Sequence, residues 1–240
     1  NTKMNDNLLN VKLRKIDVKE RKYDLKHELY LEKTQNSRLR DADIESWYHK
    51  IAKYTYPTEF VDLTIPEAQA IVEEYRNLKH DSKADWTKNP TLMHLYDKLE
   101  KILKSSSMEE VFVKLSSRSP KDSKLCQSQA KRLALDRLQA LQQHKEITTN
   151  DLVIAIMTTG IEALKMKSAK DILDTFLTSD RVCEDDLPLA LQFPERWSQH
   201  IVIRKWISVP IQYELRAFVY GNKLTALSQY FNNAYFEDVV

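Results

Sequence analysis

The sequence predicts an α+β protein. One sign is a series of long amphipathic segments that begin with helix-capping residues, and another is a set of short apolar runs bounded by turn residues. A third is the hairpin pattern at residues 213–230, where Gly221-Asn222 joins two alternating runs. Long helical stretches separate the predicted strands, so the expected topology is mixed.

The composition excludes several classes of protein and site. The 240 residues include 37 Lys and Arg and 35 Asp and Glu, and the resulting net charge of +2 argues against a nucleic-acid coat. The chain has only two glycines, Gly160 and Gly221, which excludes the Gly-rich phosphate loops of several nucleotide-binding folds. Two cysteines exclude a disulfide framework and a Cys zinc site, and the histidines lack metal-ligand spacing. No apolar run has the length of a membrane span, and we expect a cytoplasmic protein.

The first half of the chain divides into a charged N-terminal arm at residues 1–43 and a helical segment at residues 44–110. The helical segment opens with aromatic and apolar residues at helical spacing: Trp47, Tyr48, Ile51 and Tyr54. A strand follows at residues 59–63. Thr64 and Glu67 then form a capping box at the start of a helix, and Asn89-Pro90 starts another, whose buried stripe is Leu92, Leu95, Tyr96, Leu99, Ile102 and Leu103.

Residues 111–240 alternate short strands with helices. Strands are expected at residues 110–115 and 201–209, because both runs are apolar and the first is bounded by serine-rich turns. A helix is expected at 128–143, and Ser168 with Asp171 caps a later one. Between them Thr149-Asn150 caps a helix whose core is Leu152, Val153, Ile156, Ile161 and Leu164.

The two-residue turn of the hairpin predicts its register. Tyr220 is expected opposite Lys223, Phe218 opposite Thr225, Arg216 opposite Leu227 and Glu214 opposite Gln229. In this register Glu214, Arg216 and Gln229 form one polar cluster, which either faces water or forms the wall of a charged-ligand pocket. The other face would be core, with Tyr213, Leu215, Ala217, Val219, Leu224, Ala226, Ser228 and Tyr230.

Three cations interrupt apolar strands: Lys114, Arg204 and Lys205. One such lysine is explained by an edge strand or by a side chain that extends to solvent. Three of them together with Arg216 favour a phosphate site, because Arg offers a bidentate fork and Lys a point charge to phosphate oxygens. The loop at residues 116–122 is rich in hydroxyls and cations, so it would close over phosphates; its Ser-Pro step is also typical of a phosphorylation target.

These residues resemble the cell division cycle protein 123 family. The similar pieces occur in order over residues 44–240: Trp47-Tyr48 to Leu63, Val111-Phe112-x-Lys114-Leu115 to Asp122, Ile172 to Asp180, Arg204-Lys205-Trp206, and the hairpin motifs Glu214-x-Arg216-x-Phe218-Val219 and Ser228-Gln229. The resemblance implies an ATP-grasp-like fold, with ATP and Mg²⁺ between two lobes. It also implies assembly of eukaryotic translation initiation factor 2 through its gamma subunit.

The resemblance also implies roles for individual residues. Lys114 would contact phosphate, and Ser116, Ser117, Ser119 and Lys121 would line the nucleotide. Arg204 is one of the strand cations that favour a phosphate site. Lys205, Trp206 and Ile207 would form the hinge segment that contacts adenine. Glu214, Arg216 and Gln229 would form the polar wall that the predicted hairpin register also indicates.

The sequence departs from the family pattern in three places. Ser116-Ser117 stands where the family usually has Asn-Trp, and a helical insertion is expected at about 123–167. The family's D-x-N-P strand, whose Asp and Asn hold Mg²⁺, does not occur, so we expect that the C-terminal part is missing or has diverged, and no metal ligand is assigned.

Three functions remain open from the sequence. The first is an ATP-binding assembly factor without a catalytic residue, which is the function we expect. The second is an ATP-grasp ligase or phosphotransferase acting on an unknown acceptor, which only the fold analogy favours. The third is a nucleotide-free interaction module that uses the basic arm, and the near-neutral charge argues against it.

Overall fold

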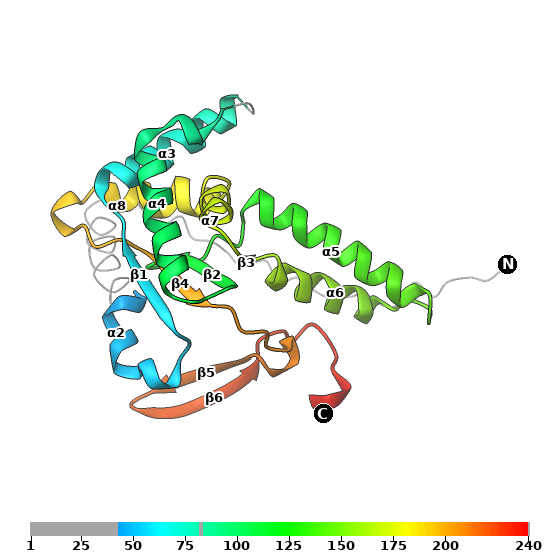
Figure 1. Cartoon of the computed structure of the whole chain (residues 1–240). Helices are drawn as coiled ribbons and strands as arrows, with labels where there is room; N and C mark the ends of the chain where they lie inside the picture. Colours follow the sequence, from blue (N-terminus) through cyan, green and yellow to red (C-terminus); the bar gives the residue numbers. More distant parts are fainter. Residues whose placement is uncertain (1–42, 82–83, 240) are drawn as a thin grey trace, which may run out of the picture. The chain divides into compact units, whose positions relative to one another are not determined.

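The computed structural model describes residues 43–81 and 84–239. The charged arm expected at 1–43 lies outside the described residues, apart from Asp43. Helices and strands are both present, which confirms the α+β class. They are arranged around a four-stranded antiparallel sheet, with a separate two-stranded hairpin (Figure 1).

The four-stranded sheet draws its strands from distant parts of the chain. Its order is β1 (Thr58–Asp62), β4 (His200–Lys205), β2 (Val111–Leu115) and β3 (Lys165–Met166). The expected strand at 201–209 is therefore too long: it ends at Lys205. Residues beyond Lys205 have no strand to pair with, because Lys205 lies opposite Val111, the first residue of β2, and Arg204 lies opposite Thr58, the first residue of β1.

Seven α-helices are described, with short turns of helix between them. The helices are α2 (Ile44–Ile51), α3 (Ile65–His80), α4 (Pro90–Ser105), α5 (Lys124–Gln142), α6 (Thr149–Glu162), α7 (Ala169–Phe176) and α8 (Leu187–Leu191). The 3₁₀ turns are Ala52–Tyr54, Trp86–Lys88, Pro194–Arg196, Ile211–Tyr213 and Glu237–Val239, and a π-helical turn is formed by Arg181–Asp186.

Most of the expected helix caps are confirmed. Thr64 and Glu67 form the capping box of α3, Asn89 caps α4, and Ser168 and Asp171 form the capping box of α7. The expected cap of α6 is wrong by one residue. Thr148 is the cap, because its hydroxyl accepts from the Asp151 amide while the Asp151 carboxylate accepts from the Thr148 amide.

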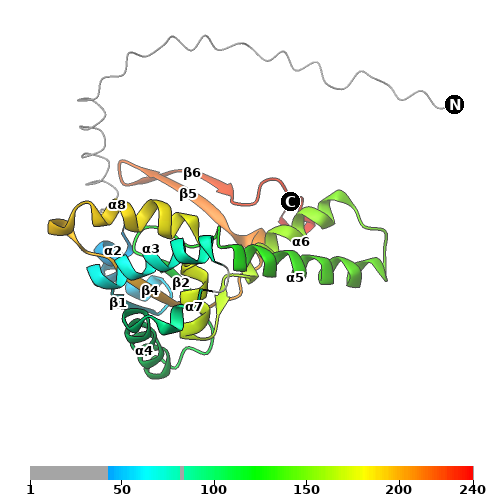
Figure 2. The ribbon, with the colours of Figure 1, turned by 90° about the horizontal axis from the view of Figure 1, so that it is seen from above.

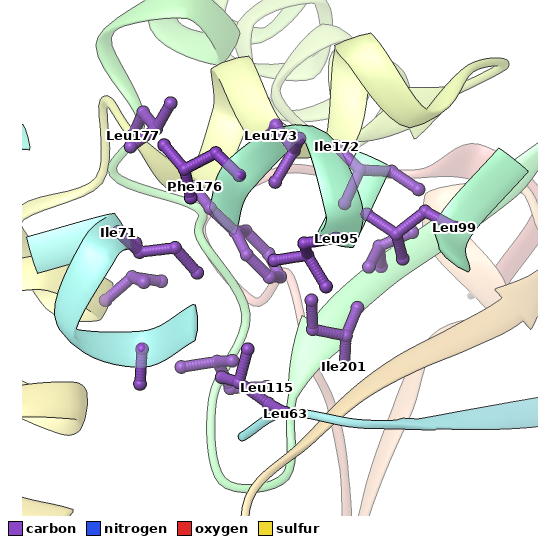
Figure 3. Close-up of a cluster of buried hydrophobic side chains, with 14 of the residues drawn as sticks. Leu63, Ile71, Leu95, Leu99, Leu115, Ile172, Leu173, Phe176, Leu177 and Ile201 are labelled. Carbon is purple, nitrogen blue, oxygen red and sulfur yellow. The ribbon is translucent and has the colours of Figure 1, made fainter. Parts of the chain in front are cut away.

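The main core lies against one face of the sheet (Figure 3). Leu95 and Leu99 of α4 meet Phe176 of α7, and all three side chains are fully buried. Leu115 and Ile201 supply the sheet side of this cluster, and Ile71 of α3 closes it. The core therefore joins the expected 44–110 segment with the 111–240 segment.

The opposite face of the sheet carries Lys114 and Arg204. Side chains alternate along a strand, so Val113 and Ile203 face the core while Lys114 and Arg204 point the other way. Helix α2 covers part of that face, where the Tyr48 and Phe60 rings meet edge to face with centroids 5.4 Å apart.

Helices α5 and α6 form an antiparallel pair, seen side by side in Figures 1 and 2. Arg137 and Glu162 link them at 3.5 Å, and Lys145 of the connection reaches Asp151 at 2.6 Å. The segment expected as an insertion, at about 123–167, contains this pair and also β3, which Lys165 and Met166 form. Two residues expected in the core of α6 are exposed, Leu152 at 42% and Ile156 at 54%.

The hairpin consists of β5 (Leu215–Tyr220) and β6 (Lys223–Gln229). Gly221 and Asn222 both have left-handed backbones, with φ of 55° and 61°, as the turn pattern predicts. The Tyr220–Lys223 pair is confirmed, but a bulge at Phe218/Val219 shifts the rest of the register by one residue. Phe218 faces Ala226, Arg216 faces Ser228, and Leu215 faces Gln229.

This shift overturns two predictions about the hairpin. Arg216 and Gln229 occupy opposite faces because their partners are adjacent residues, so the predicted cluster with Glu214 does not form on one face. Neither face is core either. The residues expected to be buried are exposed: Tyr213, Leu215, Ala217, Val219, Leu224, Ala226, Ser228 and Tyr230.

Candidate functional site

A pocket of about 540 Å³ opens beyond the end of β4. Its lining comes from the segment after β4, from α6, and from the chain on either side of the hairpin. This volume lies within the range of small-molecule sites, roughly 300–1,000 Å³. The residues that line it are Tyr56, Phe112, Lys121, Ile156, Met157, Thr158, Gly160, Ile161, Glu162, Leu164, Arg204, Lys205, Trp206, Ile207, Ser208, Val209, Ile211, Glu214, Tyr230 and Phe231.

The segment after β4 presents unpaired backbone to the pocket. The Lys205 amide donates to the Pro57 carbonyl at 3.0 Å, and the Trp206 amide donates to the Glu110 carbonyl at 2.9 Å. After these two anchors the chain leaves the sheet. Within the described structure the amides of residues 207–209 donate no hydrogen bond to a protein group. They are therefore available to a ligand with hydrogen-bond acceptors.

Arg204 is the half-buried cation of the pocket. Its Nη2 donates to the Thr55 hydroxyl at 2.6 Å, and its guanidinium lies 5.3 Å from the centre of the Tyr56 ring. Its Nε is buried without a partner, and no carboxylate of residues 43–81 or 84–239 lies within 4.0 Å. Burial lowers the pKa of Arg204, since it disfavours the charged form. An anion in the pocket would supply the missing partner.

Lys121, Glu214 and Tyr230 form a second polar corner of the pocket. The Tyr230 amide donates to the Glu214 carbonyl at 2.8 Å, which ties the end of the hairpin to its beginning. Lys121 Nζ lies 5.9 Å from the Tyr230 ring centre, and the Arg216 guanidinium lies 4.9 Å from it. Burial raises the pKa of Glu214, and the charge of Lys121 acts in the opposite direction.

The loop after β2 is held by its own polar groups. Lys114 Nζ donates to the carbonyls of Ser116 and Ser117, both at 3.1 Å. Ser116 is fully buried and accepts from the His200 amide at 3.0 Å, and the Ser117 hydroxyl donates to Asp186 at 3.0 Å. These contacts keep the loop in place without any ligand.

The structure therefore brings half of the predicted site residues to the pocket. Those that line it are Lys121, Arg204, Lys205, Trp206, Ile207 and Glu214. Those outside its lining are Lys114, Ser116, Ser117, Ser119, Arg216 and Gln229. Arg216 lies next to the lining, over the ring of Tyr230.

Helix α6 contributes a wall of the pocket that was not predicted from the sequence. Ile156 and Gly160 are four residues apart and share a helix face with Leu152, and this face lacks buried side chains. Helical spacing alone marks such a face as core. Gly160 distinguishes this face from a core face, because glycine has no apolar side chain to bury.

The described residues contain no group of three or more His, Cys, Asp or Glu that could hold a metal ion. Two carboxylates line the pocket, and one of them, Glu162, is paired with Arg137. None of the helices described is both long and apolar enough to cross a membrane.

Comparisons with known proteins relate the chain to one family. The sequence model of the D123 family matches residues 155–239, which include β4 and the hairpin. The structure of Cdc123 from Schizosaccharomyces pombe is similar, with a TM-score of 0.53 and 20% identity over 85% of this chain and 67% of that chain. A C-terminally truncated Cdc123 from the same organism has a TM-score of 0.54 and 20% identity, with 84% and 67% covered. No curated protein sequence matches the chain. The family match is limited to residues 155–239, and the two solved structures show that the chain shares its fold with Cdc123.

Proposed function

We propose that the chain binds ATP in the pocket beyond β4 and acts as an assembly factor for eukaryotic translation initiation factor 2, through that factor's gamma subunit. The proposal of ATP binding rests on Arg204, a half-buried cation in a pocket of about 540 Å³. The Nε atom of Arg204 has no hydrogen-bond partner among the described residues. The partner is proposed from the resemblance to the cell division cycle protein 123 family. An ATP-grasp-like arrangement, with nucleotide between two lobes, is part of this proposal.

The lining of the pocket suits the two ends of ATP. Arg204 and Lys121 supply positive charge for the phosphates, and Arg offers a fork that matches phosphate oxygens. The free amides of residues 207–209 suit the acceptor nitrogens of adenine. Apolar side chains of α6 and Trp206 line the remaining walls.

Mg²⁺ would enter with the nucleotide. This ion is commonly held by substrate phosphates and one or two carboxylates, and it does not need a cage made by the protein. Glu214 is the carboxylate of the lining that has no cation within ion-pair distance in the part of the chain described. Bound Mg²⁺ would neutralise phosphate charge, and Glu214 is the residue we assign to it.

The first test is an ATP titration of the full chain by calorimetry, with Arg204→Gln as the variant. A charge-assisted hydrogen bond contributes about 1.5–3 kcal/mol, so the variant should bind ATP about ten- to a hundredfold more weakly. Arg196→Gln is the matched control, since Arg196 pairs with Glu195 and lies outside the pocket lining. Equal affinity of a folded Arg204→Gln variant and the unchanged chain would refute the site.

The assembly role needs a separate measurement. Purified gamma subunit is mixed with the chain, with and without ATP, and the complex is followed by size-exclusion chromatography. We expect a complex that ATP strengthens. ATP binding without any complex would leave the nucleotide site standing and refute the assembly role.

A further inference from the structure

Gly160 has no structural explanation within the fold. It is one of only two glycines among 240 residues, and it lies in the last turn of α6, with helical residues on both sides. Glycine within a helix is less favourable than alanine, because it loses more backbone freedom on folding. Some other requirement must therefore favour a residue without a side chain at this position.

Neither the backbone nor the neighbouring residues supply that requirement. The backbone of Gly160 is not left-handed, in contrast to Gly221 in the hairpin turn. A Cβ atom added to Gly160 would meet no heavy atom within 4 Å. An alanine would therefore fit both the helix and its surroundings in the protein alone.

The free space next to Gly160 is the pocket. Gly160 belongs to its lining, together with Ile156 one turn earlier on the same helix face. Met157 and Ile161 of α6 add further apolar surface, whereas the cations of the lining, Lys121, Arg204 and Lys205, come from other elements. The α6 wall thus suits the uncharged part of a ligand.

This wall is held in place at both ends of α6. At its start the Asn150 side chain donates to the Tyr235 carbonyl at 2.9 Å and accepts from the Tyr235 amide at 2.8 Å. Near its end Glu162 pairs with Arg137 of α5. These contacts join the wall to the chain after the hairpin and to α5.

We propose that the nucleoside part of a bound nucleotide lies against the α6 face formed by Ile156 and Gly160, and that Gly160 leaves the space which the base or the ribose occupies. The α5–α6 pair is then a part of the ligand site and not a peripheral insertion. The inference rests on the proposed ATP site, and it adds the element that recognises the nucleoside.

The test combines two substitutions with three ligands. Gly160→Leu fills the space, whereas Gly160→Ala adds one methyl group. Ala140→Leu is the matched control, because Ala140 is exposed on α5 and lies outside the lining. Binding of ATP, adenosine and inorganic tripolyphosphate is measured by calorimetry, and each free protein is melted.

We expect Gly160→Leu to weaken ATP and adenosine by the same factor, at least tenfold, and to leave tripolyphosphate binding unchanged. Gly160→Ala should weaken adenosine several-fold while raising the melting temperature of the free protein by about 2–4 °C, because it removes the helix penalty of glycine. The Ala140→Leu control should bind all three ligands as the unchanged chain does.

The possible outcomes distinguish failure of this inference from failure of the proposed ATP site. Unchanged adenosine binding by both Gly160 variants would overturn the inference and leave the ATP site intact. Loss of tripolyphosphate binding along with adenosine binding would also overturn it, since the damage would then extend beyond the nucleoside wall. If the unchanged chain binds neither ATP nor adenosine, the ATP site itself is refuted, and the inference is refuted with it.

Discussion

Lys114 is a half-buried cation whose ammonium group is satisfied by the loop that follows its own strand. Its Nζ contacts two backbone carbonyls, those of Ser116 and Ser117, and no carboxylate within ion-pair distance in the described residues. Burial lowers its pKa, because the charged form loses solvation. The ammonium group has three donors and the carbonyls accept from two of them, so a phosphate contact by Lys114, as the family resemblance implies, would use the third.

Replacing Lys114 should therefore reduce stability even without nucleotide. Hydrogen bonds to a charged group contribute about 1.5–3 kcal/mol, so we expect Lys114→Met to lower the free energy of unfolding by about that amount. Methionine keeps most of the apolar stem and removes only the donor. Urea unfolding of the nucleotide-free protein measures the change.

A calorimetric ATP titration of the same variant determines whether Lys114 also binds phosphate. Unchanged stability with weaker ATP binding would show that the lysine serves the nucleotide and not the loop. Lower stability with unchanged ATP binding would show that the lysine stabilises the loop and does not bind the nucleotide.

At the scale of elements, the start of α6 depends on one carboxylate. Asp151 accepts hydrogen bonds from the Thr148 amide at 3.0 Å, from the Thr148 hydroxyl at 2.7 Å and from Lys145 at 2.6 Å. These contacts lower the pKa of Asp151 from 3.8 to about 2, and Lys145 is the largest cause. The same turn places Asn150 against Tyr235, so a local cap also anchors one wall of the pocket.

The lowered pKa of Asp151 predicts a pH dependence of stability. A carboxylate with a depressed folded-state pKa stabilises the fold above its unfolded pKa, and this contribution is lost as the pH falls from about 4 through about 2. Asp151→Asn should therefore lower stability near neutral pH, and its unfolding curve should approach that of the unchanged chain near pH 2.

The control for this prediction is Asp136→Asn, an exposed aspartate of α5 that makes no described hydrogen bond or ion pair. Its unfolding should match the unchanged chain at neutral pH. A constant difference between Asp151→Asn and the unchanged chain from pH 7 to pH 2 would show that the effect does not come from ionisation.

At the scale of the whole molecule, ATP is expected to act as a structural ligand. A ligand that binds only the folded state stabilises it by about 2.7 kcal/mol at a hundredfold excess over Kd. Rapid phosphoryl transfer requires a positioned metal to neutralise the developing charge, and Glu214 is the one carboxylate of the pocket lining without an ion pair in the described residues. We therefore expect the chain to bind Mg-ATP and to turn it over far more slowly than about 1 s⁻¹, the lower end of typical enzyme rates.

Melting temperature and ATP hydrolysis measured on one sample test this expectation. A rise in melting temperature of several degrees without hydrolysis supports the assembly function. Turnover in the range of about 1–1,000 s⁻¹, with a product that carries a new bond or a phosphate, would establish instead a ligase or phosphotransferase.

The sequence by itself determined the features whose partners are close along the chain. The capping boxes of α3 and α7 span three residues, and the Gly221-Asn222 turn needs only its own left-handed backbone, so their residue types identify them. The stripe of α4 was predictable for the same reason, since Leu92, Leu95 and Leu99 repeat with the helix period and are all fully buried. The family motif at Arg204 also placed three neighbouring residues in what proved to be the pocket lining.

Only the tertiary structure decided the features that depend on distant partners. Strand β4 ends at Lys205, next to the residues where β1 and β2 begin. The residue types at 206–209 do not indicate that the strand ends there. The bulge at Phe218 shifts the strand pairing by one residue. Side chains of the two strands that were expected on one face beyond this point therefore lie on opposite faces. The pocket itself joins Arg204, Gly160 and Tyr230, which are separated by many residues, because sheet, helix and hairpin converge there. Period and capping describe one element at a time, whereas a pocket exists only where several elements meet.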